Sequence, residues 1–216
     1  MATDLGVRKA EGNDEPGVRR PAAGSAAARP RRREDVVGAE ITLVLGGARS
    51  GKSEVAERVA LRLGGEVTYV ATGPPPEGDP EWAERVERHR ARRPEAWRTF
   101  ELGRAGDLAA CLRAITGVAL VDSLGTWVAG HDNAAVGDES IDELRAALVE
   151  RRTALMATIV VSEEVGLGVH PSSVLGRVFR DVLGVVNRGV ADVADEVLLV
   201  IAGRVLRLGA WGGPEP

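Results

Sequence analysis

The chain has one cysteine, no long apolar run and little net charge. A single cysteine, Cys111, excludes a disulfide within the chain. Its place in an apolar helical pattern predicts a small core residue rather than a nucleophile. No apolar stretch approaches the roughly 20 residues of a membrane span, and the N-terminus lacks the apolar segment of a secretory leader. We therefore expect a protein of the reducing cytoplasm with no membrane span.

Charge of one sign and clustered metal ligands are also lacking. The formal net charge is −4 over 216 residues, so no overall positive field attracts nucleic acid. The three histidines and the cysteine do not have the spacing of zinc ligands. We expect neither a nucleic-acid partner nor a zinc site.

Large apolar residues are scarce in residues 1–39, which are rich in proline, alanine, glycine and arginine. The run Arg29-Pro30-Arg31-Arg32-Arg33 lies in this part of the chain. Such a segment cannot bury enough surface to offset its chain entropy. The sequence therefore predicts a disordered tail over 1–39 and one folded domain over 40–216.

From residue 41 onward, short apolar stretches alternate with helical patterns. The stretches are typical of strands buried on both faces, and they predict strands at 41–45, 67–71, 118–121, 158–161 and 197–201. Helices are predicted at 53–63, 80–91, 105–115, 139–155 and 172–194. Residues 205–208 follow a Gly-Arg turn and predict a C-terminal β-hairpin. This order predicts an α/β fold, with a mainly parallel sheet and helices on both faces.

The most specific pattern is a phosphate loop of the form G-x-x-x-x-G-K-[ST]. It lies between the first predicted strand and the first predicted helix, which is the context the motif requires. Glycines let successive N–H groups face an anion, and the helix N-terminus adds its positive end. Lys52 is expected to reach the β- and γ-phosphates of a nucleoside triphosphate, and Ser53 to hold Mg²⁺. The loop consists of Gly46, Gly47, Ala48, Arg49, Ser50, Gly51, Lys52 and Ser53.

Polar residues follow several predicted strands. Ligands of parallel sheets bind at the carboxyl ends of the strands, so we expect Gly46, Thr72, Asp122 and Ser162 to cluster. Asp122 follows a buried apolar strand and is expected to hold Mg²⁺ directly or through water. The alternative is that Asp122 only caps the next turn.

Glu163 and Glu164 follow the fourth predicted strand and precede a glycine-rich loop. At the end of a strand, their carboxylates are placed to bind substrate or to orient water. An exposed acidic turn explains the same pattern equally well. The sequence leaves both interpretations open.

Residues 82–94 combine a histidine with several arginines. Trp82, Val86 and His89 fall on one side of the predicted helix, and this pattern alone favours a half-buried histidine among surface arginines. The alternative is chemical, because a neutral imidazole can attack an α-phosphate while cations offset the charge that builds on the phosphate oxygens. The cations nearest in sequence are Arg90, Arg92 and Arg93.

Several motifs together resemble one known family. They are GGARSGKS at 46–53, Tyr69-Val70-Ala71-Thr72, His89 with Arg93-Pro94, Trp97-Arg98-Thr99, Glu164-Val165-Gly166-Leu167-Gly168, Phe179-Arg180-Asp181 and Asn187. Their order over about 41–208 resembles the bifunctional adenosylcobinamide kinase / adenosylcobinamide-phosphate guanylyltransferase family of cobalamin synthesis. The resemblance implies a RecA-like P-loop NTPase domain that assembles as a homotrimer.

The same resemblance implies two reactions. A nucleoside triphosphate, ATP or GTP, phosphorylates the aminopropanol hydroxyl of adenosylcobinamide, and GTP then transfers GMP to that phosphate with release of pyrophosphate. His89 stands at the position of the family's guanylylated histidine, with Lys52 as the other catalytic residue and Ser53 and Asp122 as Mg²⁺ ligands. The implied nucleotide contacts are residues 46–53 together with Ala71, Thr72, Gly73, Arg90, Ala91, Arg92, Arg93, Glu101 and Asp122.

The chain departs from the family pattern at three places. Asp122 stands where some relatives carry glutamate, and Glu163 where some carry asparagine. Gly73-Pro74-Pro75-Pro76 stiffens the segment before the His89 helix, because proline fixes φ.

Two other functions fit parts of the sequence: a P-loop kinase for another small metabolite, and a GTP-dependent interaction module. The second lacks the base-reading motif N-K-x-D.

Overall fold

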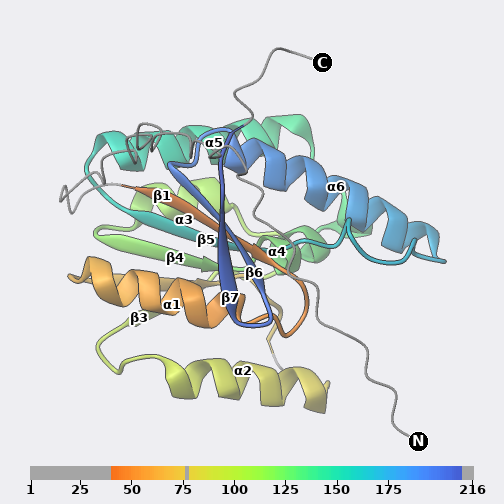
Figure 1. Cartoon of the computed structure of the whole chain (residues 1–216), viewed down its shortest axis with the longest axis horizontal. Coiled ribbons are helices and arrows are strands. Elements are labelled where there is room, and N and C mark those ends of the chain that lie inside the picture. The colour runs from red at the N-terminus through yellow and green to blue at the C-terminus, as the bar shows by residue number, and fades with distance from the viewer. Residues whose placement is uncertain (1–39, 76–77, 211–216) are drawn as a thin grey trace, which may run out of the picture. The chain divides into compact units, whose positions relative to one another are not determined.

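The computed structural model of the chain describes residues 40–75 and 78–210 (Figure 1). The predicted tail at 1–39 lies outside the described residues, as does Pro76 of the proline segment. The described part contains one sheet and the helices that cover it.

The sheet has seven strands in the order β3-β2-β4-β5-β1-β6-β7 within the described residues. All neighbouring strands pair in parallel except β6 and β7, which form an antiparallel hairpin. The mainly parallel sheet and the terminal hairpin are therefore confirmed. The strands are β1 (Ile41–Gly46), β2 (Val67–Ala71), β3 (Arg98–Glu101), β4 (Val118–Asp122), β5 (Thr158–Glu163), β6 (Glu196–Ile201) and β7 (Arg204–Leu208).

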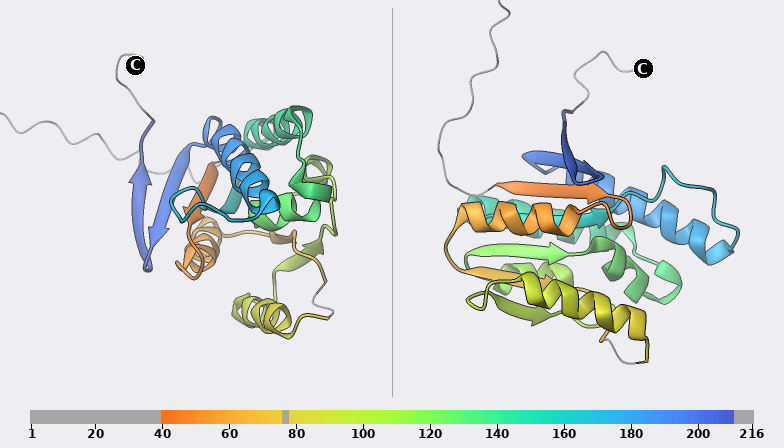
Figure 2. Two further views of the ribbon diagram at one scale, coloured as in Figure 1. Left: turned by 90° about the vertical axis from the view of Figure 1, so that its right-hand side faces the viewer. Right: turned by 60° about the horizontal axis from the view of Figure 1, so that its bottom comes forward.

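Helices cover both faces of the sheet, as predicted (Figure 2). The helices α1 and α2 lie on one face, and α3 to α6 lie on the other. This arrangement, with the phosphate loop following β1, is the RecA-like P-loop α/β fold that was expected. The helices are α1 (Lys52–Leu63), α2 (Pro80–Arg92), α3 (Leu108–Ala114), α4 (Leu124–Gly130), α5 (Asp138–Thr153) and α6 (Val174–Ala191), with a 3₁₀ turn η1 (Asp132–Ala134).

The central strands are apolar at consecutive positions because each of their faces packs against helices. Leu43 points into the core on the α3–α6 side, and the next residue, Val44, points into the core on the α1 side. On β5, Val160 likewise points to the α3–α6 side and Ile159 to the α1 side. Each such side chain contributes about 1.5–3 kcal/mol through burial.

The sequence patterns did not predict the strand β3 or the helix α4, and the predicted position of one side chain was wrong. The strand β3 is fully exposed, so it lacks the apolar run by which the others were recognised. The helix α4 follows β4 at once and contains two glycines, which weakens a helical pattern. Ser162 does not join the cluster at the strand ends, because its buried hydroxyl bonds Asn187 of α6.

Candidate active site

The phosphate loop has the backbone that its glycines allow. Gly51 adopts a left-handed φ of 93° immediately before α1, a conformation that costs little only for glycine. A Cβ at Gly46 would lie 2.7 Å from the carbonyl oxygen of Val200 on β6. The turn therefore fits closely between β1 and β6, and it delivers Lys52 and Ser53 to the first turn of α1.

Lys52 is buried at the base of this loop. Its Nζ lies 3.3 Å from the carbonyl oxygen of Gly47 and 3.3 Å from Oε1 of Glu163 at the end of β5. The Ser123 hydroxyl donates to the same carboxylate, at 3.0 Å from Oε2. The exposed acidic turn is therefore the wrong interpretation for Glu163, which faces the loop lysine.

Asp122 is the most closely surrounded carboxylate of the site. The hydroxyl of Tyr69 donates to its Oδ2 at 2.8 Å, and Nδ1 of His89 lies 3.4 Å from the same atom. Burial alone would raise the pKa of Asp122, but hydrogen bonds from His89, Tyr69 and Ser53 hold it below its usual value. The capping alternative is wrong, because Ser123 caps α4.

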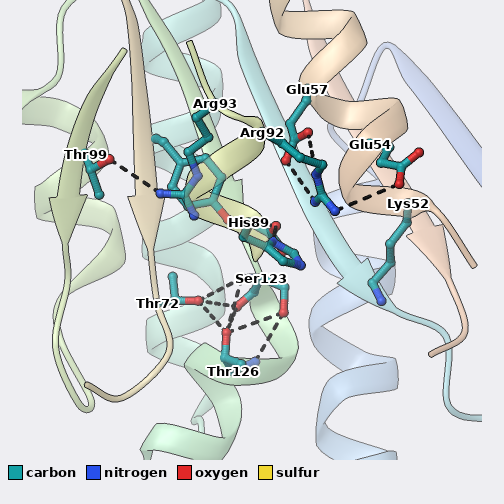
Figure 3. Close-up of polar contacts among 12 residues, drawn as sticks. Lys52, Glu54, Glu57, Thr72, His89, Arg92, Arg93, Thr99, Ser123 and Thr126 are labelled. Carbon is teal, nitrogen blue, oxygen red and sulfur yellow. Dashed lines mark hydrogen bonds and ion pairs between the residues drawn. The ribbon is translucent and has the colours of Figure 1, made fainter. Parts of the chain in front are cut away.

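The helix α2 brings His89 to Asp122 without burying any residue of its own. The Asp79 side chain caps its first turn, accepting from the backbone N–H groups of Glu81 and Trp82. At the other end, Arg92 forms a bidentate pair with Glu57 of α1, at 3.1 and 3.2 Å. Figure 3 shows His89 between this pair and the cluster of Thr72, Ser123 and Thr126.

Contacts of two aromatic rings, Tyr69 and Trp82, lie near the two ends of α2. The Arg93 guanidinium lies over the ring of Tyr69, 3.3 Å from its centroid. The face of an aromatic ring attracts a cation, so this contact stabilises the position of Arg93. A Cβ at Gly73 would lie 2.4 Å from the ring of Trp82, whose Nε1 donates to the carbonyl of Pro74. Only a glycine at position 73 allows the indole to approach so closely.

His89 stands where two hollows meet. The larger one, of about 640 Å³, separates the phosphate loop from α2 and is lined by Lys52, Ser53 and Arg92 among others. The smaller one lies beside β2 and β3 and is lined by Tyr69 and Asp122. Because His89 lines both, a group carried on its ring could be passed from one hollow to the other.

The predicted site residues differ in their surroundings. Residues 46–53, Thr72, His89 and Asp122 surround one another at the carboxyl edge of the sheet, where Thr72 bonds the backbone of Ser123. The arginines are held by protein partners: Arg90 by Glu101, Arg92 by Glu57 and Arg93 by Tyr69. Arg49 and Ala91 are exposed, and Ala71 and Gly73 line the smaller hollow.

Tyr69, Ser123 and Thr126 also belong to the site, although no sequence pattern predicted a role for them. Tyr69 and Ala71 share a face of β2 by strand alternation, so the position of Tyr69 could have been inferred from the predicted strand. The spacing of Ser123 and Thr126 is that of a capping box, and the structure forms one. That pattern also marks the start of the missed helix α4.

A glycine loop with a buried lysine, joined at the strand ends to a carboxylate, defines this chain as a P-loop nucleotide-binding protein of the α/β class. The family described as cobinamide kinase / cobinamide phosphate guanyltransferase has a sequence model that matches residues 42–208. The chain belongs to this family.

Curated relatives agree with the family match. The bifunctional adenosylcobalamin biosynthesis protein CobP of Pseudomonas aeruginosa is 41% identical over 167 residues, covering 74% of this chain and 92% of the relative. The protein CobU of Salmonella typhimurium is 36% identical over 177 residues, covering 74% and 95%. Among solved structures, the flagellar accessory protein FlaH of Methanocaldococcus jannaschii aligns with a TM-score of 0.46 and 15% identity, over 78% of this chain and 75% of that one.

Membership of the family confirms the bifunctional enzyme that the motifs predicted. The chain is a cobinamide kinase and a cobinamide phosphate guanylyltransferase of adenosylcobalamin biosynthesis. A kinase for an unrelated metabolite and a GTP-dependent interaction module are therefore set aside.

Proposed function

We propose that one nucleotide site serves both reactions and that His89 carries GMP from GTP to the phosphorylated acceptor. The observation that carries this proposal is the contact between Nδ1 of His89 and the Asp122 carboxylate. A carboxylate at Nδ1 favours the proton on that nitrogen and leaves the lone pair on Nε2. We take Nε2 as the nucleophile, which the sequence alone did not decide.

In the kinase reaction, the phosphate loop acts by position and charge. The N–H groups of residues 46–53 surround the phosphates, and Lys52 turns from Glu163 toward the β- and γ-phosphates. Ser53 and Asp122 fit Mg²⁺, because a hydroxyl and a carboxylate at the carboxyl edge of the sheet, close enough for Ser53 to help lower the pKa of Asp122, supply the oxygen ligands that this ion prefers. When bound, the ion neutralises charge on the phosphate oxygens.

In the guanylyl reaction, Nε2 attacks the α-phosphorus of GTP and forms a P–N bond while pyrophosphate leaves. The phosphate of the acceptor then attacks the same phosphorus, and the P–N bond breaks to restore His89. Asp122 stabilises the imidazole while it carries positive charge. The further proposed nucleotide contacts are Ala71, Thr72, Gly73, Arg90, Ala91, Arg92, Arg93, Glu101 and Asp122.

Two separate assays test the proposal. Phosphorylation of cobinamide is measured with γ-labelled nucleotide, and GMP transfer is measured with α-labelled GTP and cobinamide phosphate. We expect His89→Asn to lose GMP transfer and keep phosphorylation, and Lys52→Ala to lose both. Kinase turnover that persists in Lys52→Ala contradicts the shared site.

We propose further that the chain works as a homotrimer in the cytoplasm, as the family resemblance implies. Within 40–75 and 78–210, no helix is long and apolar enough to cross a membrane. Light scattering on the purified protein should give a mass near three times 22.7 kDa. The mass of a single chain contradicts the trimer.

A further inference from the structure

We propose that residues 164–178, which join β5 to α6 and include its first turns, form the surface that binds the corrin ring of the acceptor. We call them the acceptor segment. Cobinamide is a substrate of this family, but the two hollows beside His89 have to hold the nucleotide. The macrocycle therefore needs a surface of its own. The proposal rests on the proposed function in one respect, that the γ-phosphoryl group lies at Lys52.

The acceptor segment presents large apolar side chains to solvent. Val169 is 96% exposed, Leu167 80% and Val174 69%, and Leu175 and Val178 are exposed as well. The last three lie on the first turns of α6, and the other two lie in the loop before it. Single apolar side chains on a surface are common, but several gathered in one segment mark a binding site.

The acceptor segment begins at the nucleotide site. The backbone N–H of Glu164 donates to the carbonyl oxygen of Gly46 in the phosphate loop, at 3.1 Å, and the preceding residue, Glu163, pairs with Lys52. From there the chain runs beyond the carboxyl edge of the sheet to α6 (Figure 2). A ring bound on this segment therefore lies beside the phosphate loop, within reach of which its hydroxyl-bearing arm has to come.

The acceptor segment is held in place although its apolar side chains are exposed. The Arg177 guanidinium donates to the carbonyl oxygens of Pro171 and Ser172, and the Ser173 side chain caps α6. Pro171 also packs on the helix, because a Cβ at Gly176 would lie 2.9 Å from the Cβ of Pro171. A surface that is ordered before its ligand arrives binds with a smaller loss of conformational entropy.

Polar side chains stand next to the apolar ones in the sequence. The Arg180 guanidinium lies 2.8 Å from Nδ1 of His170 and pairs with Asp181. The corrin ring of cobinamide is a large, mostly apolar macrocycle with amide side chains at its rim. Such a ligand requires apolar contact and a few hydrogen-bond partners, and this part of the chain supplies both.

A second copy of the chain is the other occupant that an exposed apolar surface suggests. A protein seated on the acceptor segment would cover the edge of the sheet beside the phosphate loop, where the acceptor has to enter. The edge strand β7, which is exposed along its whole length, offers a second copy a different surface. The position of the acceptor segment therefore favours the corrinoid.

The test replaces two exposed apolar side chains of the acceptor segment with polar ones. In the double variant Leu167→Gln with Val169→Gln, the KM for cobinamide in the phosphorylation assay should rise at least about tenfold, because apolar contact with the ring is lost. The KM for cobinamide phosphate in the GMP-transfer assay should rise in the same way. The kcat values and the KM for nucleotide should change less than about threefold, since they depend on the phosphate loop and His89.

Leu155→Gln is the matched control. Leu155 is 78% exposed, much as Leu167 is, but it precedes β5 and so lies at the opposite edge of the sheet. Its replacement should leave every one of these constants unchanged. A second pair of substitutions, Val174→Gln with Leu175→Gln on α6, should raise the KM for both corrinoids as the first pair does.

Three results would each overturn the proposal. An unchanged KM for cobinamide in both pairs means that the ring binds elsewhere. An equal rise in the KM for nucleotide means that the segment only supports the phosphate loop. A lower mass by light scattering in both pairs, but not in Leu155→Gln, means that a second copy covers the segment. Absence of a GMP adduct on His89, or kinase turnover in Lys52→Ala, contradicts the proposed function instead and leaves the KM comparison for cobinamide valid.

Discussion

The three histidines of the chain differ in what their rings contact. Nδ1 of His131 bonds the carbonyl of Trp127, and its ring packs edge-on against that indole. His170 lies beside Arg180 in an exposed loop. His89 faces a buried carboxylate and two hollows. Only the last setting orients an imidazole and gives a phosphate access to it.

Cys111 is a core residue, as its pattern predicted, and its environment predicts how the thiol behaves. Burial raises the pKa of this thiol to about 11. At pH 8 we expect it to stay unmodified by a thiol reagent in the folded protein and to react fully in denaturant. Rapid reaction of the folded protein contradicts the buried position.

The same shift predicts how stability depends on pH. The unfolded thiol ionises near pH 9 and the folded one near pH 11, so the unfolded chain releases its proton first. The contribution of Cys111 is therefore complete below pH 9 and is lost as pH rises to 11, by about 1–2 kcal/mol. Denaturant unfolding at pH 8 and 10.5 should show a smaller fall for Cys111→Ala than for the wild type.

At the scale of elements, α2 is the part of the domain whose position depends on polar contacts. It has no buried residue, and the pair between Arg92 and Glu57 joins it to α1. We expect Arg92→Ala to lower the rate of GMP transfer about tenfold, because His89 loses its alignment. The free energy of unfolding should fall by no more than about 1 kcal/mol, since little apolar surface is involved.

Glu57→Gln should lower the rate of GMP transfer less than Arg92→Ala does, because it breaks the same pair but keeps Arg92 as a proposed nucleotide contact, and the double variant should add little to Arg92→Ala. Arg145→Ala, which breaks a pair within α5, is the control and should leave GMP transfer unchanged. Hydrogen exchange of residues 80–92 measures the loosening directly. Unchanged exchange in Arg92→Ala contradicts the role given to this pair.

The strands that are buried on both faces could be predicted, because a short run of consecutive apolar residues is typical of such a strand. The ends of the strands were harder to predict. The strand β5 continues to Glu163, two residues beyond its apolar run, because Gly46 of β1 pairs with Glu163. The phosphate loop and His89 were predictable from motifs. The contacts around His89 were not, because Asp122, which His89 contacts, and Tyr69 and Glu57, which bond Asp122 and Arg92, come from distant segments that only the tertiary fold brings together.

At the scale of the whole molecule, one buried cation joins three elements. Arg151 of α5 is 1% exposed, and its guanidinium donates to Thr158 of β5 and to four backbone carbonyls. The carbonyl of Leu112 belongs to α3, and those of Ile115, Gly117 and Ala157 lie in the connections that enter β4 and β5. Burial lowers the pKa of the guanidinium to about 10, so it stays charged at neutral pH.

Removal of that cation should destabilise the whole domain. Arg151→Met leaves the buried carbonyls without their donor, and we expect the free energy of unfolding to fall by roughly 3–5 kcal/mol. Arg152→Met changes the neighbouring, partly exposed arginine and should cost less than about 1 kcal/mol. Urea unfolding of both variants checks the difference, and equal losses contradict the role of Arg151.

The most direct test of the proposed role of His89 is to trap the covalent intermediate. The protein is incubated with α-labelled GTP and Mg²⁺ without acceptor, denatured, digested and examined for the labelled peptide. We predict one GMP on His89, joined by a P–N bond that survives base and is lost in acid, and no label in His89→Asn. Label that is absent from the wild type, or equally present in His89→Asn, contradicts the central claim that His89 transfers GMP.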